Sequence, residues 1–242
     1  MTRRMRAALG LILLPALAAG CGTGVTAGTE NPPARAATSG SLPSSASASR
    51  SARPATGAPL LKAPARPCRT LNARTRARIG MPKTRKDEHD TFDVTCHWTN
   101  DPGDNPPFTF RDLKVTYDAG IEGVMSLADQ ERAFERKRRD DYRQPSLFGG
   151  APSVKGTIKQ VGSVSAGKDF DEGYYVYFVY RIGEARRGEG RAVIRKRNVL
   201  ITISVSGSDV PGRSMRESKP LPNAAAQRVL DAVADPLTAA VS

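Results

Sequence analysis

The sequence predicts an α+β domain, and three observations carry that prediction. Residues 92–99 alternate between apolar and polar side chains, which is typical of a strand with one buried face. Residues 191–204 place apolar side chains opposite apolar side chains when they fold as a hairpin around Arg197 and Asn198. Residues 223–234 carry apolar side chains at helical spacing. Strands and helices thus share one stretch of chain, as expected for a mixed domain.

The amino-terminal segment, residues 1–20, is predicted to be a secretory signal peptide that takes no part in the fold. Arg3, Arg4 and Arg6 precede an apolar run of thirteen residues, and small residues follow that run. A helix that crosses a bilayer needs about twenty apolar residues, so this run is not expected to be a transmembrane helix.

Cys21 comes directly after Ala18, Ala19 and Gly20. This arrangement resembles the lipobox of bacterial lipoproteins, although Ala18 stands where that pattern usually has leucine. The resemblance implies that Cys21 receives a diacylglycerol and becomes the mature amino terminus. The protein would then be anchored to the membrane by lipid, on its extracytoplasmic face. The alternative is an ordinary secreted protein in which Cys21 has no such role.

Residues 21–66 are predicted to form a disordered tether between the anchor and a single domain over residues 67–242. Ala, Ser, Pro, Gly or Thr occupy 34 of the 45 positions from 22 to 66, and none of these positions is aromatic. Such a composition cannot bury enough apolar surface to offset the entropy of ordering. The segment is therefore expected to lift the domain off the membrane.

The cysteines predict one disulfide. If lipid occupies Cys21, Cys68 and Cys96 remain, which is an even number in an oxidising compartment. A bond between them closes a loop of 29 residues, for which the chain-entropy model gives about 3–4 kcal/mol. A metal site is not expected, because the chain has two histidines and no Cys-x-x-Cys spacing.

Two more helices and two strands are expected before residue 149. A short helix is expected over residues 72–79, and strands are expected over residues 92–99 and 112–117. Ser126 and Asp129 form a capping-box pattern that opens a helix, which Pro145 must end. Residues 149–171 show no clear period.

The carboxy-terminal part gives the stronger patterns. Residues 174–180 are apolar on both faces, which predicts a central strand covered on both sides; the alternative is an exposed aromatic binding platform. The turn at Arg197 and Asn198 is expected to have two residues, or three if Arg197 does not adopt a positive φ. A closing helix begins at Asn223 and is expected to be interrupted at Pro236.

Together, the lipobox, the tether, Cys68 before a short helix and the segment Cys96-His97-Trp98 resemble secreted actinobacterial lipoproteins of unknown function. The resemblance implies an antiparallel sheet of about five or more strands with helices packed on it. It further implies a fold similar to the PsbP/Mog1-like fold or to the sensor ectodomains of mycobacterial kinases. It brings no catalytic residues and no cofactor.

Two motifs are candidates for catalytic or metal-binding chemistry. Ser165 and Lys168 match the Ser-x-x-Lys nucleophile motif of penicillin-interacting enzymes, but the Ser-x-Asn and Lys-Thr-Gly elements of those enzymes are missing from the sequence. The acidic run at residues 87–90 lacks the ligand spacing of a calcium loop and is expected to be a solvated turn. No cofactor or metal is expected.

Basic residues offer the best candidate contact surface. The formal net charge is +13, and export excludes nucleic acid as the partner. The candidates fall into a helix cluster and a hairpin cluster: Arg136, Lys137, Arg138 and Arg139; Arg195, Lys196 and Arg197. If the helix packs beside the hairpin, the two would form one basic surface for anionic lipid, an anionic envelope polymer or another envelope protein. The alternative is an ordinary solvated helix.

The sequence therefore predicts a non-enzymatic, membrane-anchored lipoprotein with a ligand-binding, partner-binding or sensor-like domain. The alternative function is a serine-dependent envelope hydrolase or transpeptidase-like enzyme that uses Ser165.

Overall fold

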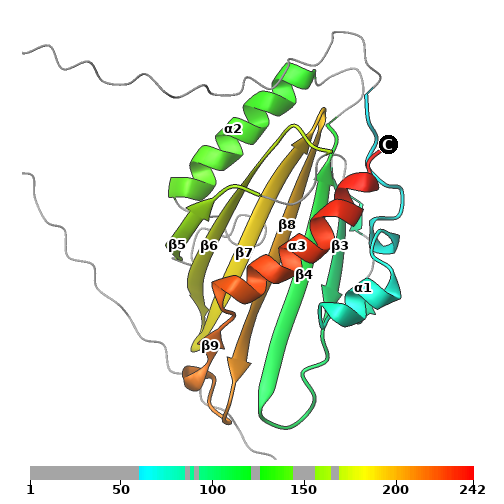
Figure 1. The fold of residues 1–242 in the computed structure, drawn as a ribbon. Helices are drawn as coiled ribbons and strands as arrows, with labels where there is room; N and C mark the ends of the chain where they lie inside the picture. Colours follow the sequence, from blue (N-terminus) through cyan, green and yellow to red (C-terminus); the bar gives the residue numbers. More distant parts are fainter. Residues whose placement is uncertain (1–59, 85–87, 90–92, 121–125, 144–155, 165–168) are drawn as a thin grey trace, which may run out of the picture. The chain divides into compact units, whose positions relative to one another are not determined.

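A computed structural model describes residues 60–84, 88–89, 93–120, 126–143, 156–164 and 169–242, which lie in the compact unit Ser49–Ser242. Within these residues, nine strands form one antiparallel sheet that carries helices on its faces (Figure 1). The predicted α+β class with five or more strands is confirmed. The finer expectation of a PsbP/Mog1-like fold stays a prediction.

The sheet has a single path of hydrogen-bonded neighbours, with two short strands off it. Along the path lie β1 (Lys83–Thr84), β3 (Asp93–Thr99), β4 (Phe108–Asp118), β8 (Val199–Val210), β7 (Ala185–Lys196), β6 (Glu172–Ile182) and β5 (Thr157–Gly162). The short strands are β2 (Glu88–His89), which pairs with β3, and β9 (Lys219–Pro220), which pairs with β8. All of the pairs are antiparallel.

Among the described residues, three α-helices and two short 3₁₀ turns accompany the sheet. They are η1 (Pro67–Arg69), α1 (Ala73–Arg78), α2 (Leu127–Arg143), η3 (Met215–Glu217) and α3 (Asn223–Ala239). Asn72 caps α1 by accepting a hydrogen bond from the backbone N–H of Thr75. The predicted capping box is present at the start of α2, where Ser126 and Asp129 bond reciprocally. No helix in the described ranges is long and apolar enough to cross a membrane.

The main core lies between the sheet and α3, which crosses β7 and β8 (Figure 1). Its largest fully buried side chains include Trp98, Leu113, Tyr117, Ile194, Ile201 and Ile203. Helix α3 comes unusually close to β7 because Gly190 has no side chain. A Cβ at that position would lie 2.7 Å from the Cβ of Ala226 and 2.8 Å from the hydroxyl of Tyr175.

Helix α3 runs through Pro236, so the predicted interruption there is wrong. Its last turn is held by packing, since Leu237 is fully buried. The side chain of Lys196 also donates to the carbonyl oxygen of Thr238 at 3.1 Å. Tertiary contacts therefore outweigh the hydrogen bond that the proline removes.

A second, smaller core lies on the opposite face of the sheet, under α2. Phe134 of α2 packs there against Tyr174 of β6, with ring centroids 5.4 Å apart. On the α3 face, the hydroxyl of Tyr177 donates to the carbonyl oxygen of Leu221 at 2.6 Å. Strand β6 is thus covered on both sides as predicted, and the alternative of an exposed aromatic platform is wrong.

The predicted hairpin register is confirmed. Ile194 pairs with Ile201, and Val193 pairs with Thr202. The turn has two residues, and Arg197 adopts the positive φ, at 56°. This backbone is supported by Asp171, whose side chain accepts a hydrogen bond from the N–H of Arg197 at 2.6 Å.

Residues just before η1 are tied to the same turn. The side-chain amide of Asn198 accepts from the N–H of Leu61 at 2.7 Å and donates to the carbonyl oxygen of Leu61 at 2.9 Å. The N–H of Lys62 donates to the carbonyl oxygen of Ser242 at 2.6 Å. Residues 61 and 62 therefore lie at the end of the sheet that carries the β7–β8 turn.

Candidate functional site

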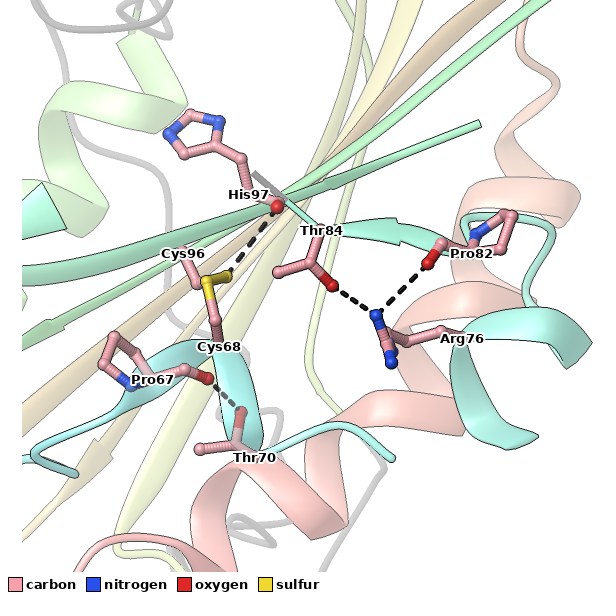
Figure 2. Close-up of a disulfide and its surroundings, with 8 residues drawn as sticks. All are labelled: Pro67, Cys68, Thr70, Arg76, Pro82, Thr84, Cys96 and His97. Carbon is pink, nitrogen blue, oxygen red and sulfur yellow. Dashed lines mark hydrogen bonds between the residues drawn. A yellow bond between two sulfur atoms is a disulfide. The ribbon is translucent and has the colours of Figure 1, made fainter. Parts of the chain in front are cut away.

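The predicted disulfide joins Cys68 in η1 to Cys96 in β3, with Cα atoms 5.1 Å apart (Figure 2). Cys96 lies on the inward face of its strand, as predicted, and is fully buried. The neighbouring loop is tied down by Arg76, whose guanidinium donates to the carbonyl oxygen of Pro82 at 3.1 Å and bonds to Thr84. The disulfide is structural, since it fixes the amino-terminal turns to the sheet.

The polar side chains of the domain gather on the sheet face that α2 partly covers, which we call the polar face. Strand register aligns them in two transverse rows across β3, β4, β8 and β7. One row is Thr99, Asp112, Ser206 and Glu189; the other is His97, Lys114, Ser204 and Arg191. The same strands present apolar side chains to α3, because successive residues of a strand point to opposite faces.

A buried ionic network links α2 to the polar face. The guanidinium of Arg191 contacts Asp141 of α2 at 2.8 Å and Glu189 at 2.8 Å. The hydroxyl of Tyr174 donates to the other oxygen of Asp141 at 2.6 Å. All of these side chains are more than nine-tenths buried. The guanidinium also lies 5.2 Å from the centre of the Phe178 ring, a cation–π distance.

Burial dominates the titration of the polar face. Loss of hydration raises the pKa of the Glu189 carboxyl, and the nearby charge of Arg191 opposes that rise only in part. Burial also raises the pKa of the Tyr180 hydroxyl and lowers the pKa of the Lys137 ammonium. The fold therefore holds several ionisable groups where their charged forms are disfavoured.

The hydrogen bonding of several buried atoms on this face is incomplete within the described part of the chain. Glu189 Oε2 and Arg187 Nε have no partner there, and the hydroxyls of Tyr180 and Ser206 interact only with each other. Buried polar atoms are nearly always satisfied in folded proteins, so a cluster of exceptions needs an explanation. Such exceptions occur at strained or catalytic groups and where an ion or a bound water completes the hydrogen bonding.

A pocket of about 460 Å³ opens beside these atoms. Its lining includes His97, Thr99, Asn100, Phe110, Asp112 and Arg187, which come from β3, β4, β7 and the loop after β3. Thr99 and Asp112 are direct cross-strand partners and form the end of the first polar row. The pocket is therefore continuous with the polar face, and its lining contains no residue of α2.

These features belong to a chain whose residues 16–177 match the family described as "protein of unknown function", DUF3558. The chain is a member of DUF3558. The resemblance to an uncharacterised family is thereby confirmed at that level, whereas its actinobacterial and lipoprotein details stay predictions. No curated protein matches the chain. In this DUF3558 member the match includes His97, Thr99 and Asp112 and ends within β6, before Arg187 and Glu189.

The predicted helix cluster is divided between two sides of α2. Arg136 and Arg139 are exposed, and Arg138 forms an ion pair with Glu135 at 2.5 Å. Lys137 is partly buried, and the charges of Asp141 and Arg191 beneath the helix affect the pKa of its ammonium. Only part of this cluster therefore faces solvent.

The hairpin cluster is held by local partners. Arg195 forms ion pairs with Asp171 at 3.1 Å and with Glu172 at 2.5 Å. Lys196 points to the opposite face and reaches the end of α3. In this DUF3558 domain Lys196 therefore lies on the face opposite α2, and Arg195 and Lys196 already form ion pairs with acidic side chains beside the hairpin.

The other candidates from the sequence are the cysteine predicted to carry lipid, the Ser-x-x-Lys motif and the acidic run. Cys21, Ser165 and Lys168 lie outside the described residues, as do Asp87 and Asp90 of the acidic run. Glu88 and His89 form β2 and pair with β3. No cluster of three possible metal ligands occurs in the described ranges.

Sequence reasoning missed the polar face, although a signal was present. Arg187, Glu189 and Arg191 are charged at every second position of β7, and Ser204, Ser206 and Ser208 repeat in the same way along β8. A polar period of two inside two long, buried strands indicates a polar layer on one face.

Proposed function

We propose that this chain is a lipoprotein, anchored through Cys21 at the extracytoplasmic face of the cell membrane, whose domain binds a small polar ligand at the polar face. The proposal includes no catalytic role. The observation that carries it is the group of buried polar side chains beside the pocket, in which Glu189 Oε2 and Arg187 Nε have no hydrogen-bond partner among the described residues and the hydroxyls of Tyr180 and Ser206 have only each other.

Anchoring is supported by the order of segments along the chain. A basic, apolar and small-residue sequence precedes Cys21, and the family match begins at residue 16 and so includes that cysteine. The Cys68–Cys96 disulfide is typical of an oxidising compartment outside the cytoplasm.

The geometry of the domain fits a tethered binder. The tether meets the domain at Asn198, next to the β7–β8 turn. Ser206, on the row that leads to the pocket, lies about 26 Å farther along β8 at the rise of an extended strand. The pocket therefore lies toward the end of the sheet that points away from the attachment of the tether.

A second candidate, contact with an anionic envelope polymer or lipid, is favoured by the exposed outer side of α2. Arg136 and Arg139 line a surface depression there and have no ion pair among the described residues. The serine-hydrolase alternative has no supporting observation.

Ligand binding is tested with a screen of small polar fragments against the isotope-labelled full-length chain. Binding should shift the backbone amide signals of Thr99, Asp112 and Arg187 and leave those of α3 unchanged. Shifts confined to the outer side of α2 would favour the second candidate, and the absence of shifts at the pocket across the screen would refute the proposed site.

Anchoring is tested by the intact mass of the protein taken from the native membrane. The mature chain should begin at Cys21 and carry a diacylglycerol, and the Cys21→Ala variant should appear in the soluble fraction. A mature chain with another start, or with a free thiol at Cys21, would refute the anchor.

A further inference from the structure

We infer that the ligand of the pocket is an uncharged, polyhydroxylated molecule, a saccharide of one or two rings. The inference rests on the proposed function and adds the chemical class of the ligand. It follows from the hydrogen-bonding types, charges and surfaces of the pocket and of the rows behind it.

The pocket lining contains both hydrogen-bond donors and hydrogen-bond acceptors. Asp112, as a carboxylate, only accepts hydrogen bonds, whereas Arg187 only donates them. A ligand that satisfies both must carry groups that donate and accept. Hydroxyl groups do this, and adjacent hydroxyls on a sugar ring offer several such pairs at close spacing.

Charge excludes strongly ionic ligands. The pocket lining contains one carboxylate, Asp112, and two cations, Arg187 and Arg111, of which Arg111 is already paired with Asp209 at 2.7 Å. The network behind the pocket combines Glu189 and Asp141 with Arg191. An anion attracted by Arg187 would be repelled by Asp112, and a cation attracted by Asp112 would be repelled by Arg187. The balanced charges thus favour a neutral ligand.

The pocket also has an apolar wall. Phe110 and Pro102 contribute to the lining, and such surfaces pack against the C–H faces of sugar rings. The volume of about 460 Å³ lies within the range of small-molecule sites.

A peptide strand fits less well, although its amides also donate and accept. Peptide strands bind at sheet edges, where unpaired main-chain groups extend the ladder. This pocket lies on a face of the sheet, over strands β3 and β4 whose main-chain groups are already paired with their neighbours. Side chains therefore make the recognition, as in saccharide binding.

The test compares matched probes on the isotope-labelled full-length chain: maltose and diacetylchitobiose as neutral saccharides, glucose 6-phosphate as an anion, glucosamine as a cation, and dialanine as a peptide. At least one neutral saccharide should shift the amide signals of Thr99 and Asp112. Asp112→Asn and Arg187→Gln should each weaken its binding about ten-fold. Arg228→Gln, which removes an exposed charge of α3 on the other face of the sheet, should leave binding unchanged.

The outcomes separate the ligand class from the site. Stronger binding of the phosphate, amine or peptide probe at the same amides overturns the saccharide class and leaves the proposed site standing. Failure of both neutral saccharides to shift those amides overturns the class, and the site itself is then decided by the fragment screen. Near-ultraviolet circular dichroism, which reports on Trp98 on the other face, checks that each variant is folded.

Discussion

At the scale of single residues, the buried carboxyl of Glu189 makes the stability of the domain depend on pH. This carboxyl is fully buried on β7, the strand that lies between β6 and β8, and Arg191 is its charged partner. The same guanidinium is shared with Asp141, so one cation faces two carboxylates. Burial therefore prevails, and the native pKa of Glu189 lies above its ordinary value of 4.5.

The sign of the resulting pH dependence follows from proton binding. Between pH 4.5 and the raised pKa, the native state binds more protons at Glu189 than the unfolded state does. The contribution of this group to stability is complete below pH 4.5 and is lost as the pH rises through the native pKa.

We therefore expect the Glu189→Gln variant to lack this loss. The free energy of unfolding of the wild type should fall relative to that of the variant as the pH rises above 4.5, measured by urea denaturation across a pH series. Arg136→Gln on the outer side of α2 serves as the charge-change control and should follow the wild type. Parallel curves for wild type and Glu189→Gln would contradict the expectation.

At the scale of elements, the disulfide determines how firmly the amino-terminal turns are attached. Replacing both cysteines, Cys68→Ala with Cys96→Ala, should lower the free energy of unfolding by about 3–4 kcal/mol, because the unfolded chain regains the entropy of an open loop. Denaturant titration measures the loss. A reducing agent should destabilise the wild type by a similar amount and have no effect on the double variant.

The two long helices should differ in how tightly they hold the sheet. Helix α3 buries Ala226, Leu230, Val233, Ala234 and Leu237 against the main core. Helix α2 buries one large apolar side chain, Phe134, beside the polar Gln130 and Asp141. Its attachment relies on one aromatic contact and a buried ionic network, which contributes little net stability after desolvation.

Removing the central apolar side chain of each helix tests this difference. Leu230→Ala should lower the free energy of global unfolding by about 2–5 kcal/mol. Phe134→Ala should instead release α2 locally, so that its amides lose protection from hydrogen exchange while those of β7 and β8 keep theirs. Equal loss of protection in helix and sheet would show that α2 and the sheet unfold together.

At the scale of the whole molecule, the two ends of the domain are brought together at one point. Leu61 and Lys62, near the end of the predicted tether, meet Ser242 and the turn residue Asn198. Asn198 is almost fully buried, and its amide satisfies both main-chain groups of Leu61. This junction holds the chain before η1 against the end of the sheet that carries the β7–β8 turn.

Asn198→Ala should leave the main-chain groups of Leu61 without their partners, at a cost of about 1–3 kcal/mol in the free energy of unfolding. Hydrogen exchange should rise at Leu61 and Lys62 in particular. Lys62→Ala is the matched control, because it keeps the main-chain pairing with Ser242. Unchanged exchange in Asn198→Ala would show that the junction does not depend on this side chain.

The elements with a clear period were predictable. The hairpin register, the start of α3 and the inward position of Cys96 follow from local spacing. Strand β5 was not predicted, because residues 149–171 show no period and edge strands bury little. The interruption at Pro236 was predicted wrongly, since a local rule cannot include the burial of Leu237.

The sequence by itself determined the α+β class, the β7–β8 pairing and the choice of Cys68 and Cys96 as partners, because each depends on the pattern of nearby residues or on their number. Only the tertiary structure decided which polar residues meet. Thr99, Asp112, Ser206 and Glu189 lie far apart along the chain, and the pairing of β3, β4, β8 and β7 places them in one row. That row depends on the register of four strands at once, and a shift of one residue in any strand would turn its polar side chains to the other face.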